Sequence, residues 1–186
     1  PQKVSPRVHL GVTVSKFARV KGFDMDLLYA LGITDGIWKG LPAVFFPHFV
    51  TGQDSAPTAV HVRRSLEKRD DLPRFEWYRG DRPVPYGLGL LQKSGAKECG
   101  FVYLVEGESD VIALLHKNRP ALGIPGNHWR EDWSSYLDGI ERIIVAVEPD
   151  GGGERLVASL SRSSLWSRCS LIRFGAGAHA AQGVAS

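Results

Sequence analysis

Two short acidic segments of this sequence, EGESD and EPD, supply four candidate site carboxylates: Glu106 and Asp110 in the first, and Glu148 and Asp150 in the second. Carboxylates that lie together repel one another unless a cation neutralises them. Sites built only from oxygen ligands favour Mg²⁺ or Mn²⁺ over zinc. If the fold brings the two segments together, the sequence predicts a divalent-metal site with these carboxylates as candidate ligands.

Each acidic segment directly follows an apolar run, FVYLV at 101–105 and RIIVAV at 142–147. Runs of this length, bounded by glycine and charge, are typical of strands buried on both faces. In open α/β sheets, ligands bind in the crevice beyond the carboxyl ends of the strands. Both acidic segments are therefore expected to face one crevice.

The first acidic segment also contains a predicted turn from strand to helix, which would direct Glu106 and Asp110 into the crevice. Gly107 supplies the backbone freedom for a sharp reversal from strand to helix. Ser109 is the expected N-cap of a helix over 109–117, which places Asp110 in its first turn. The alternative is structural: Asp110 caps its own helix, and Glu148 lies in an ordinary loop.

The second acidic segment runs into three glycines, 151–153. Gly152 is a candidate nucleotide-binding residue, because glycines allow close backbone approach and a helix over 153–163 would turn its first N–H groups towards a phosphate. A plain turn is the alternative interpretation of this triplet.

The second half of the chain alternates strands and helices. Strands are expected at 101–105, 121–124, 142–147 and 170–174, and helices at 109–117, 128–137 and 153–163. This alternation predicts parallel strands in a Rossmann-like layered fold. The first half differs, with a short helix pair before residue 33 and an antiparallel sheet from strands at 43–50, 58–64 and 74–78.

A basic cluster interleaved with aromatic residues lies in the first half. Its candidate nucleic-acid- or nucleotide-binding residues are Arg63, Arg64, Arg74, Arg79 and Arg82, with Lys68 and Arg69 nearby and Phe75, Trp77 and Tyr78 between them. Cations neutralise phosphates and aromatic faces stack bases, which suits single-stranded nucleic acid. The alternative is a solvated strand face whose aromatic side chains point into the core.

The pairing of EGxxD with a later acidic-x-acidic motif resembles the Toprim domain shared by bacterial-type DNA primases, topoisomerases and certain nucleases. Upstream, FPHF, HVRRS and RFEWYRGDRPVPYGL are similar, in order, to the basic subdomain that precedes Toprim in the RNA polymerase core of bacterial and phage primases. The similarity is greatest to primase-like proteins of phages and plasmids, and covers about residues 12–172. Where this family usually has Asp-x-Asp, this chain has Glu148-Pro149-Asp150.

The resemblance implies an α/β fold, with a small α+β basic subdomain at residues 1–98 and a Toprim Rossmann-like parallel-sheet subdomain at 99–186. It implies a nucleotidyltransferase that synthesises short RNA primers on single-stranded DNA in replication, dependent on Mg²⁺ or Mn²⁺. The implied partners are the DNA template, nucleoside triphosphates and a replicative helicase, fused or recruited. Glu106 and Asp150 would be catalytic, and Glu106, Asp110, Glu148 and Asp150 would hold metal.

Two other functions fit the same residues. A Toprim nuclease would use the carboxylates to hydrolyse phosphodiesters, although the upstream basic segment favours the primase. A non-catalytic module that binds single-stranded nucleic acid is favoured by Glu148 and by the acid-poor end of the chain.

Composition is that of an ordinary globular chain, with 186 residues, 43% hydrophobic, 23% charged and a net charge of +3. No apolar run reaches membrane-spanning length and no signal peptide is present, so a cytoplasmic protein is expected. The two isolated cysteines indicate neither a disulfide framework nor a zinc ribbon. Because primases commonly carry a zinc domain before the core, an excised core or a compact variant is expected.

Overall fold

The structure, a computed structural model, describes residues 11–67, 70, 73–91 and 96–173. These described residues form two compact units: one holds those up to Pro47 together with those within Ala59–Asp81, and the other holds His48–Thr58 and those from Arg82 onward. The subdomain division after residue 98, expected within the polar segment 91–100, stays a prediction.

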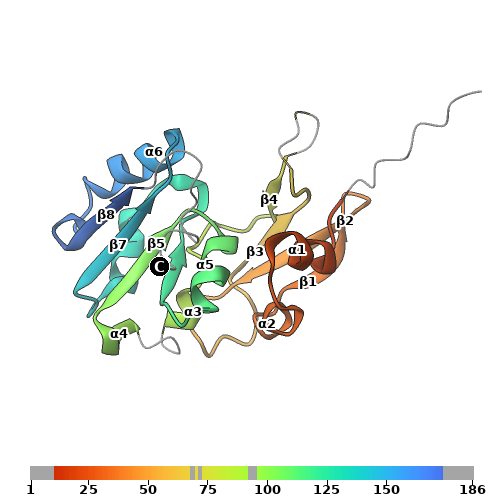
Figure 1. Ribbon diagram of the computed structural model, residues 1–186, viewed down its shortest axis with the longest axis horizontal. Coiled ribbons are helices and arrows are strands. Elements are labelled where there is room, and N and C mark those ends of the chain that lie inside the picture. Colours follow the sequence, from red (N-terminus) through yellow and green to blue (C-terminus); the bar gives the residue numbers. More distant parts are fainter. Residues whose placement is uncertain (1–10, 68–69, 71–72, 92–95, 174–186) are drawn as a thin grey trace, which may run out of the picture. The chain divides into compact units, whose positions relative to one another are not determined.

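The first unit combines two short helices with a four-stranded sheet of order β1-β2-β3-β4 (Figure 1). Its elements are α1 (Val14–Lys21), α2 (Met25–Ala30), β1 (Thr34–Trp38), β2 (Leu41–His48), β3 (Ala59–Arg63) and β4 (Phe75–Trp77). The expected helix pair and three strands are present. β1 was not expected, and it pairs antiparallel with β2.

The helices of the first unit begin and end at suitable residues. Thr13 caps α1 by accepting a hydrogen bond from the Lys16 N–H, and Gly22 ends it in the left-handed conformation. Asp24 caps α2 by accepting from two backbone N–H groups. Phe17 of α1 packs edge-on against Phe46 of β2, with ring centroids 5.4 Å apart, which anchors the helix pair to the sheet.

Glu76 ties three parts of the first unit together. Its Oε2 accepts from Trp38 Nε1 at 2.9 Å and pairs with Lys39 Nζ at 2.6 Å, while its Oε1 accepts from Arg64 Nη1. Burial alone would raise the pKa of Glu76, but the hydrogen bonds from Lys39, Trp38 and Arg64 outweigh it and lower the pKa to about 2.

Glu76→Gln is expected to lower the free energy of unfolding at pH 7 by about 2 kcal/mol, because it leaves the buried Arg64 without its counter-charge. The folded-state pKa is below the usual 4.5, so this stabilisation is complete above the unfolded pKa and is lost as the pH falls from about 5 to 2. Urea unfolding of both proteins across this range measures it. A difference that does not change with pH would contradict the assignment.

The second unit is built on a parallel sheet of order β6-β5-β7-β8, in which β5, β7 and β8 lie side by side (Figure 1). Its strands are β5 (Phe101–Val105), β6 (Ala121–Gly123), β7 (Arg142–Val147) and β8 (Cys169–Arg173). Its helices are α3 (Leu88–Leu91), α4 (Ala96–Cys99), α5 (Glu108–Leu115) and α6 (Gly151–Leu160), with 3₁₀ turns η1 (Pro125–Asn127), η2 (Glu131–Leu137) and η3 (Trp166–Arg168). The predicted parallel sheet is confirmed.

Helix starts in the second unit differ from those expected. α5 begins at Glu108 with Gly107 as its N-cap, so Ser109 lies inside the first turn and is not the cap. α6 begins at Gly151, two residues early, because the Asp150 side chain accepts hydrogen bonds from the N–H groups that follow it.

The helix predicted over 128–137 was wrong in type and extent. The segment forms the 3₁₀ turn η2, and Trp129 lies before it. The Trp129 N–H donates to Ser159 Oγ at 2.8 Å, which holds this backbone outside a helix. The expected packing survives, because the rings of Trp129 and Trp133 are 5.7 Å apart at 86° and both are buried in the core.

The core of the second unit surrounds its two central strands, where Val102, Leu104, Ile143 and Val145 are fully buried. Within the described residues, no helix combines the length and the apolar character needed to cross a membrane.

Candidate active site at the carboxyl edge of the parallel sheet

The two acidic segments lie at the same edge of the sheet. β5 and β7 are parallel neighbours, with Leu104 opposite Val145. Glu106 follows the last residue of β5 and Glu148 follows the last residue of β7. Parallel strands end on the same side, so the structure brings together the segments that the sequence analysis singled out.

Electrostatic interactions link the four carboxylates. The pKa of Glu106 is raised from its usual 4.5 to about 7, first by burial and then by the charges of Asp150, Glu148 and Asp110. Glu106 Oε1 is buried and has no hydrogen-bond partner. Among the residues that the structure describes, no three of these carboxylates bring oxygens within 4.8 Å of one another. The four carboxylates therefore affect one another electrostatically without forming a compact ligand cluster.

Asp150 has a structural contact as well as an electrostatic one. Its Oδ1 accepts hydrogen bonds from Gly152 N at 2.7 Å and Gly153 N at 3.1 Å, which caps α6. Both bonds go to the same oxygen, so the cap does not engage Oδ2. Asp150 can thus begin a helix and offer the second oxygen to a ligand.

The glycines after Asp150 are required by close packing. A Cβ at Gly152 would lie 2.2 Å from Asn127 Nδ2, and a Cβ at Gly153 would lie 2.3 Å from the Glu148 carbonyl oxygen. The N–H groups considered for phosphate binding already donate to Asp150. The phosphate role of Gly152 stays a prediction, and packing explains the glycine.

Asn127 is a site residue that the sequence analysis missed. Its side chain hydrogen-bonds to Glu106, which lowers the pKa of that carboxyl against the larger effects that raise it. Asn127 lies in η1, after β6, the strand beside β5. The rule that ligands bind beyond strand ends could have found it, because the carboxyl end of β6 reaches the same edge.

The predicted basic residues divide into two groups. Arg63 and Arg64 are buried: the Arg63 guanidinium lies 5.2 Å from the Phe17 ring and 4.7 Å from the Phe75 ring, and Arg64 pairs with Glu76. Arg74, Arg79 and Arg82 are exposed. Lys68 and Arg69 lie outside the described residues. A nucleic-acid role stays a prediction for all five candidates, and the exposed three present their charge to solvent.

An aromatic ladder crosses β3 and β4 in the first unit. The His61 ring stacks on Phe75 at 4.9 Å and on Trp77 at 4.3 Å, each with an interplanar angle of 18°. Arg74 lies over the Phe75 ring at 5.4 Å. The sequence showed the aromatic residues but not the central place of His61.

Comparison by sequence finds no relative: no protein-family model matches the chain, and no curated protein matches it. Comparison by structure finds proteins of similar fold. The DnaG catalytic core has a TM-score of 0.70 at 15% identity, over 91% of this chain and 67% of that one. The Aquifex aeolicus primase, with its zinc-binding and RNA polymerase domains, has a TM-score of 0.70 at 15% identity, over 91% of this chain and 51% of that one.

The primase fragment of the bacteriophage T7 primase-helicase protein is also similar, with a TM-score of 0.66 at 14% identity, over 98% of this chain and 76% of that one. These likenesses agree with the resemblance found in EGxxD and in the segments upstream of it. The chain has the fold of the Toprim-type catalytic core of DNA primases.

Proposed function

We propose that this chain is the catalytic core of a DNA primase, a nucleotidyltransferase that synthesises short RNA primers on single-stranded DNA in replication. The observation that carries the proposal is Glu106, a half-buried carboxyl whose buried Oε1 lacks a hydrogen-bond partner and whose pKa is raised to about 7 beside three further carboxylates. Such a residue costs folding free energy and is typical of catalytic sites. Its place in a primase fold supports nucleotidyl transfer.

The residues at the sheet edge fit a divalent cation. An all-oxygen set of carboxylates is the ligand type that Mg²⁺ and Mn²⁺ prefer, and a cation would satisfy Glu106 Oε1. Glu106 and Asp150 would hold it directly, with Asp110 as a further ligand and Glu148 acting directly or through water. Bound divalent ions supply activation of the attacking 3′-hydroxyl and stabilisation of the pyrophosphate leaving group.

The first unit offers the groups that a template strand needs. Exposed Arg74 and Arg79 can neutralise phosphates, and the partly exposed ladder of His61, Phe75 and Trp77 can stack bases. One similar structure is a DnaG primase catalytic domain bound to single-stranded DNA, and another belongs to a primase-helicase protein. We therefore include single-stranded DNA, nucleoside triphosphates and a helicase among the proposed partners.

Arg74→Ala is expected to weaken binding of single-stranded DNA regardless of its sequence, because it removes a phosphate contact. The slope of log K against log salt should fall by about 0.7, the value for one contact on a single strand. Fluorescence anisotropy at several salt concentrations measures the slope. Arg119→Ala, an exposed arginine of the second unit, is the matched control. An unchanged slope in Arg74→Ala would place the contact surface elsewhere.

Synthesis of primers on single-stranded DNA tests the proposed function. The intact protein that contains this chain is incubated with template, labelled ribonucleotides and Mg²⁺ or Mn²⁺, and short RNA products are expected. Degradation of labelled template without added nucleotides would indicate a nuclease instead. Binding without synthesis or degradation would leave a non-catalytic binding module.

A further inference from the structure

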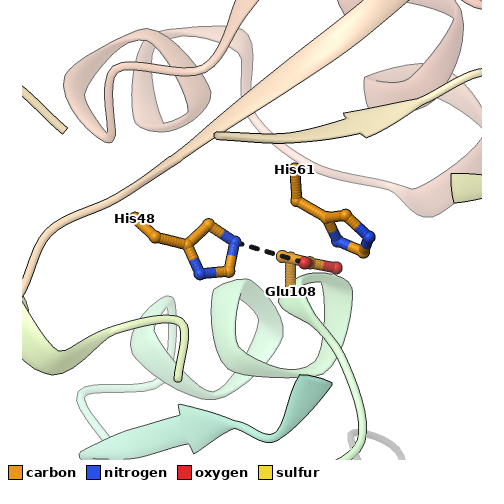
Figure 2. Close-up of side chains that lie close together, drawn as sticks. All are labelled: His48, His61 and Glu108. Carbon is orange, nitrogen blue, oxygen red and sulfur yellow. Dashed lines mark ion pairs between the residues drawn. The ribbon is translucent and has the colours of Figure 1, made fainter. Parts of the chain in front are cut away.

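A buried histidine and glutamate lie beside the proposed active site, within the second unit. His48, the last residue of β2, is 1% exposed, and Glu108, the first residue of α5, is 6% exposed. His48 Nε2 faces Glu108 Oε1 at 3.4 Å (Figure 2). Glu108 lies between Glu106 and Asp110 in the sequence, so a contact that holds Glu108 in place also affects the positions of these two carboxylates.

The other side of the imidazole is also held. His48 Nδ1 lies 2.9 Å from the Val84 carbonyl oxygen. A carbonyl can only accept, so Nδ1 carries the hydrogen and donates it. The Tyr86 ring packs against the imidazole at 5.0 Å and 64°. These two contacts fix the plane of the ring and aim Nε2 at Glu108.

Backbone packing also supports the turn that carries Glu106. Gly107 is the N-cap of α5 and makes no side-chain capping hydrogen bond. The neighbouring strand supports the turn by packing, because a Cβ at Gly123 would lie 3.1 Å from the Gly107 backbone. Gly123 is itself held by two backbone hydrogen bonds to Tyr86, of 2.9 and 3.0 Å.

We propose that His48 is a positioning residue for the metal site and acts through Glu108. By holding the first residue of α5, it fixes the rotation of the helix's first turn and so the directions of Glu106 and Asp110. Glu108 is thereby an anchor, directed at His48, and not a fifth carboxylate of the site. This inference rests on the proposed function, because it assigns His48 to the same site.

Two substitutions of His48 separate its two nitrogens. Glutamine places an amide nitrogen near the position of Nε2, so His48→Gln keeps a nitrogen that faces Glu108. Asparagine places one near the position of Nδ1, so His48→Asn keeps the hydrogen bond to Val84 and loses the contact with Glu108. The purified chain is titrated with Mn²⁺ alone by calorimetry, and thermal unfolding is recorded separately.

His48→Asn is expected to weaken Mn²⁺ binding by about 10- to 100-fold, the range for changes beside a metal's direct ligands. His48→Gln should keep most of the affinity. Equal losses in the two variants would overturn the proposal, since that result indicates only lost packing. Unchanged affinity in His48→Asn would overturn it too.

Glu108→Met keeps the side-chain length and removes the partner of His48, which provides a second route if His48→Asn does not fold. It should weaken Mn²⁺ binding as His48→Asn does, and where both single variants fold, the double variant should be no weaker than either. Full affinity in Glu108→Met, or additive losses, would refute the pair. If the wild-type chain does not bind Mn²⁺, both the metal site and the proposed function are contradicted. A wild type that binds, beside variants that bind equally well, overturns this inference alone.

Discussion

Asp150→Asn is expected to abolish primer synthesis and to weaken Mn²⁺ binding, and Glu106→Gln is expected to do the same. Each change removes the charge of a proposed direct ligand, so the loss should exceed the roughly 10- to 100-fold caused by changes beside the ligands. Asparagine caps helices as well as aspartate does, so α6 should keep its start. Primer assays with Mg²⁺ or Mn²⁺ and calorimetric metal titration measure both effects.

Asp24→Asn is the matched control, because Asp24 also caps a helix by accepting hydrogen bonds from two backbone N–H groups, but at the start of α2 in the first unit. Glu148→Asp should retain metal binding, since a shorter carboxylate can act through one of the waters that Mg²⁺ usually keeps. Full synthesis by Asp150→Asn with unchanged metal affinity would exclude a catalytic role for these carboxylates and leave the binding module.

Glu106→Gln is expected to stabilise the metal-free protein while it inactivates the enzyme. The pKa of Glu106 is raised from 4.5 to about 7 in the fold, so folding favours the protonated form. The cost of its ionisation appears as the pH rises through 4.5 and is complete above 7. At pH 8 the free energy of unfolding of Glu106→Gln should exceed that of the wild type by about 1–3 kcal/mol. At pH 4 the two proteins should have the same free energy of unfolding.

Mn²⁺ is expected to stabilise the wild type more than Glu106→Gln, because only the ionised carboxylate of Glu106 binds the cation. Binding therefore displaces the proton of Glu106. Wild-type affinity should rise between pH 6 and 8, and added Mn²⁺ should raise the unfolding temperature of the wild type more than that of Glu106→Gln. Denaturant unfolding in chelator and thermal unfolding with Mn²⁺ make the comparison. Equal free energies of unfolding for the two metal-free proteins at pH 8 would show that ionisation of Glu106 does not destabilise the folded protein.

The parts of the site that follow local patterns could be predicted from the sequence. β5 and β7 are apolar runs that end in acid, and their alternation with helices implies a parallel sheet whose strand ends meet. β1 could not be found in this way, because TDGIW is largely exposed and forms a strand only by pairing with β2. Local periodicity carries no signal for such a strand.

Contacts between residues distant in the sequence were also hidden. Arg64 has the sequence context of a phosphate-binding arginine, and only the fold shows that Glu76 neutralises it. His48 and Glu108 are unremarkable where they stand in the chain, since nothing local indicates that they meet. Asn127 lay within reach of the strand-end rule but carries no charge to draw attention to it.

The close packing at Gly152 and Gly153 changes how variation at this site would be interpreted. A methyl group at Gly153 would overlap the Glu148 backbone, and one at Gly152 would displace the Asn127 side chain, so both glycines have a packing reason to be kept. Glycine kept at both positions across a lineage would therefore report the space that Asn127 and the Glu148 backbone occupy. It would not count as evidence that a nucleotide touches the loop.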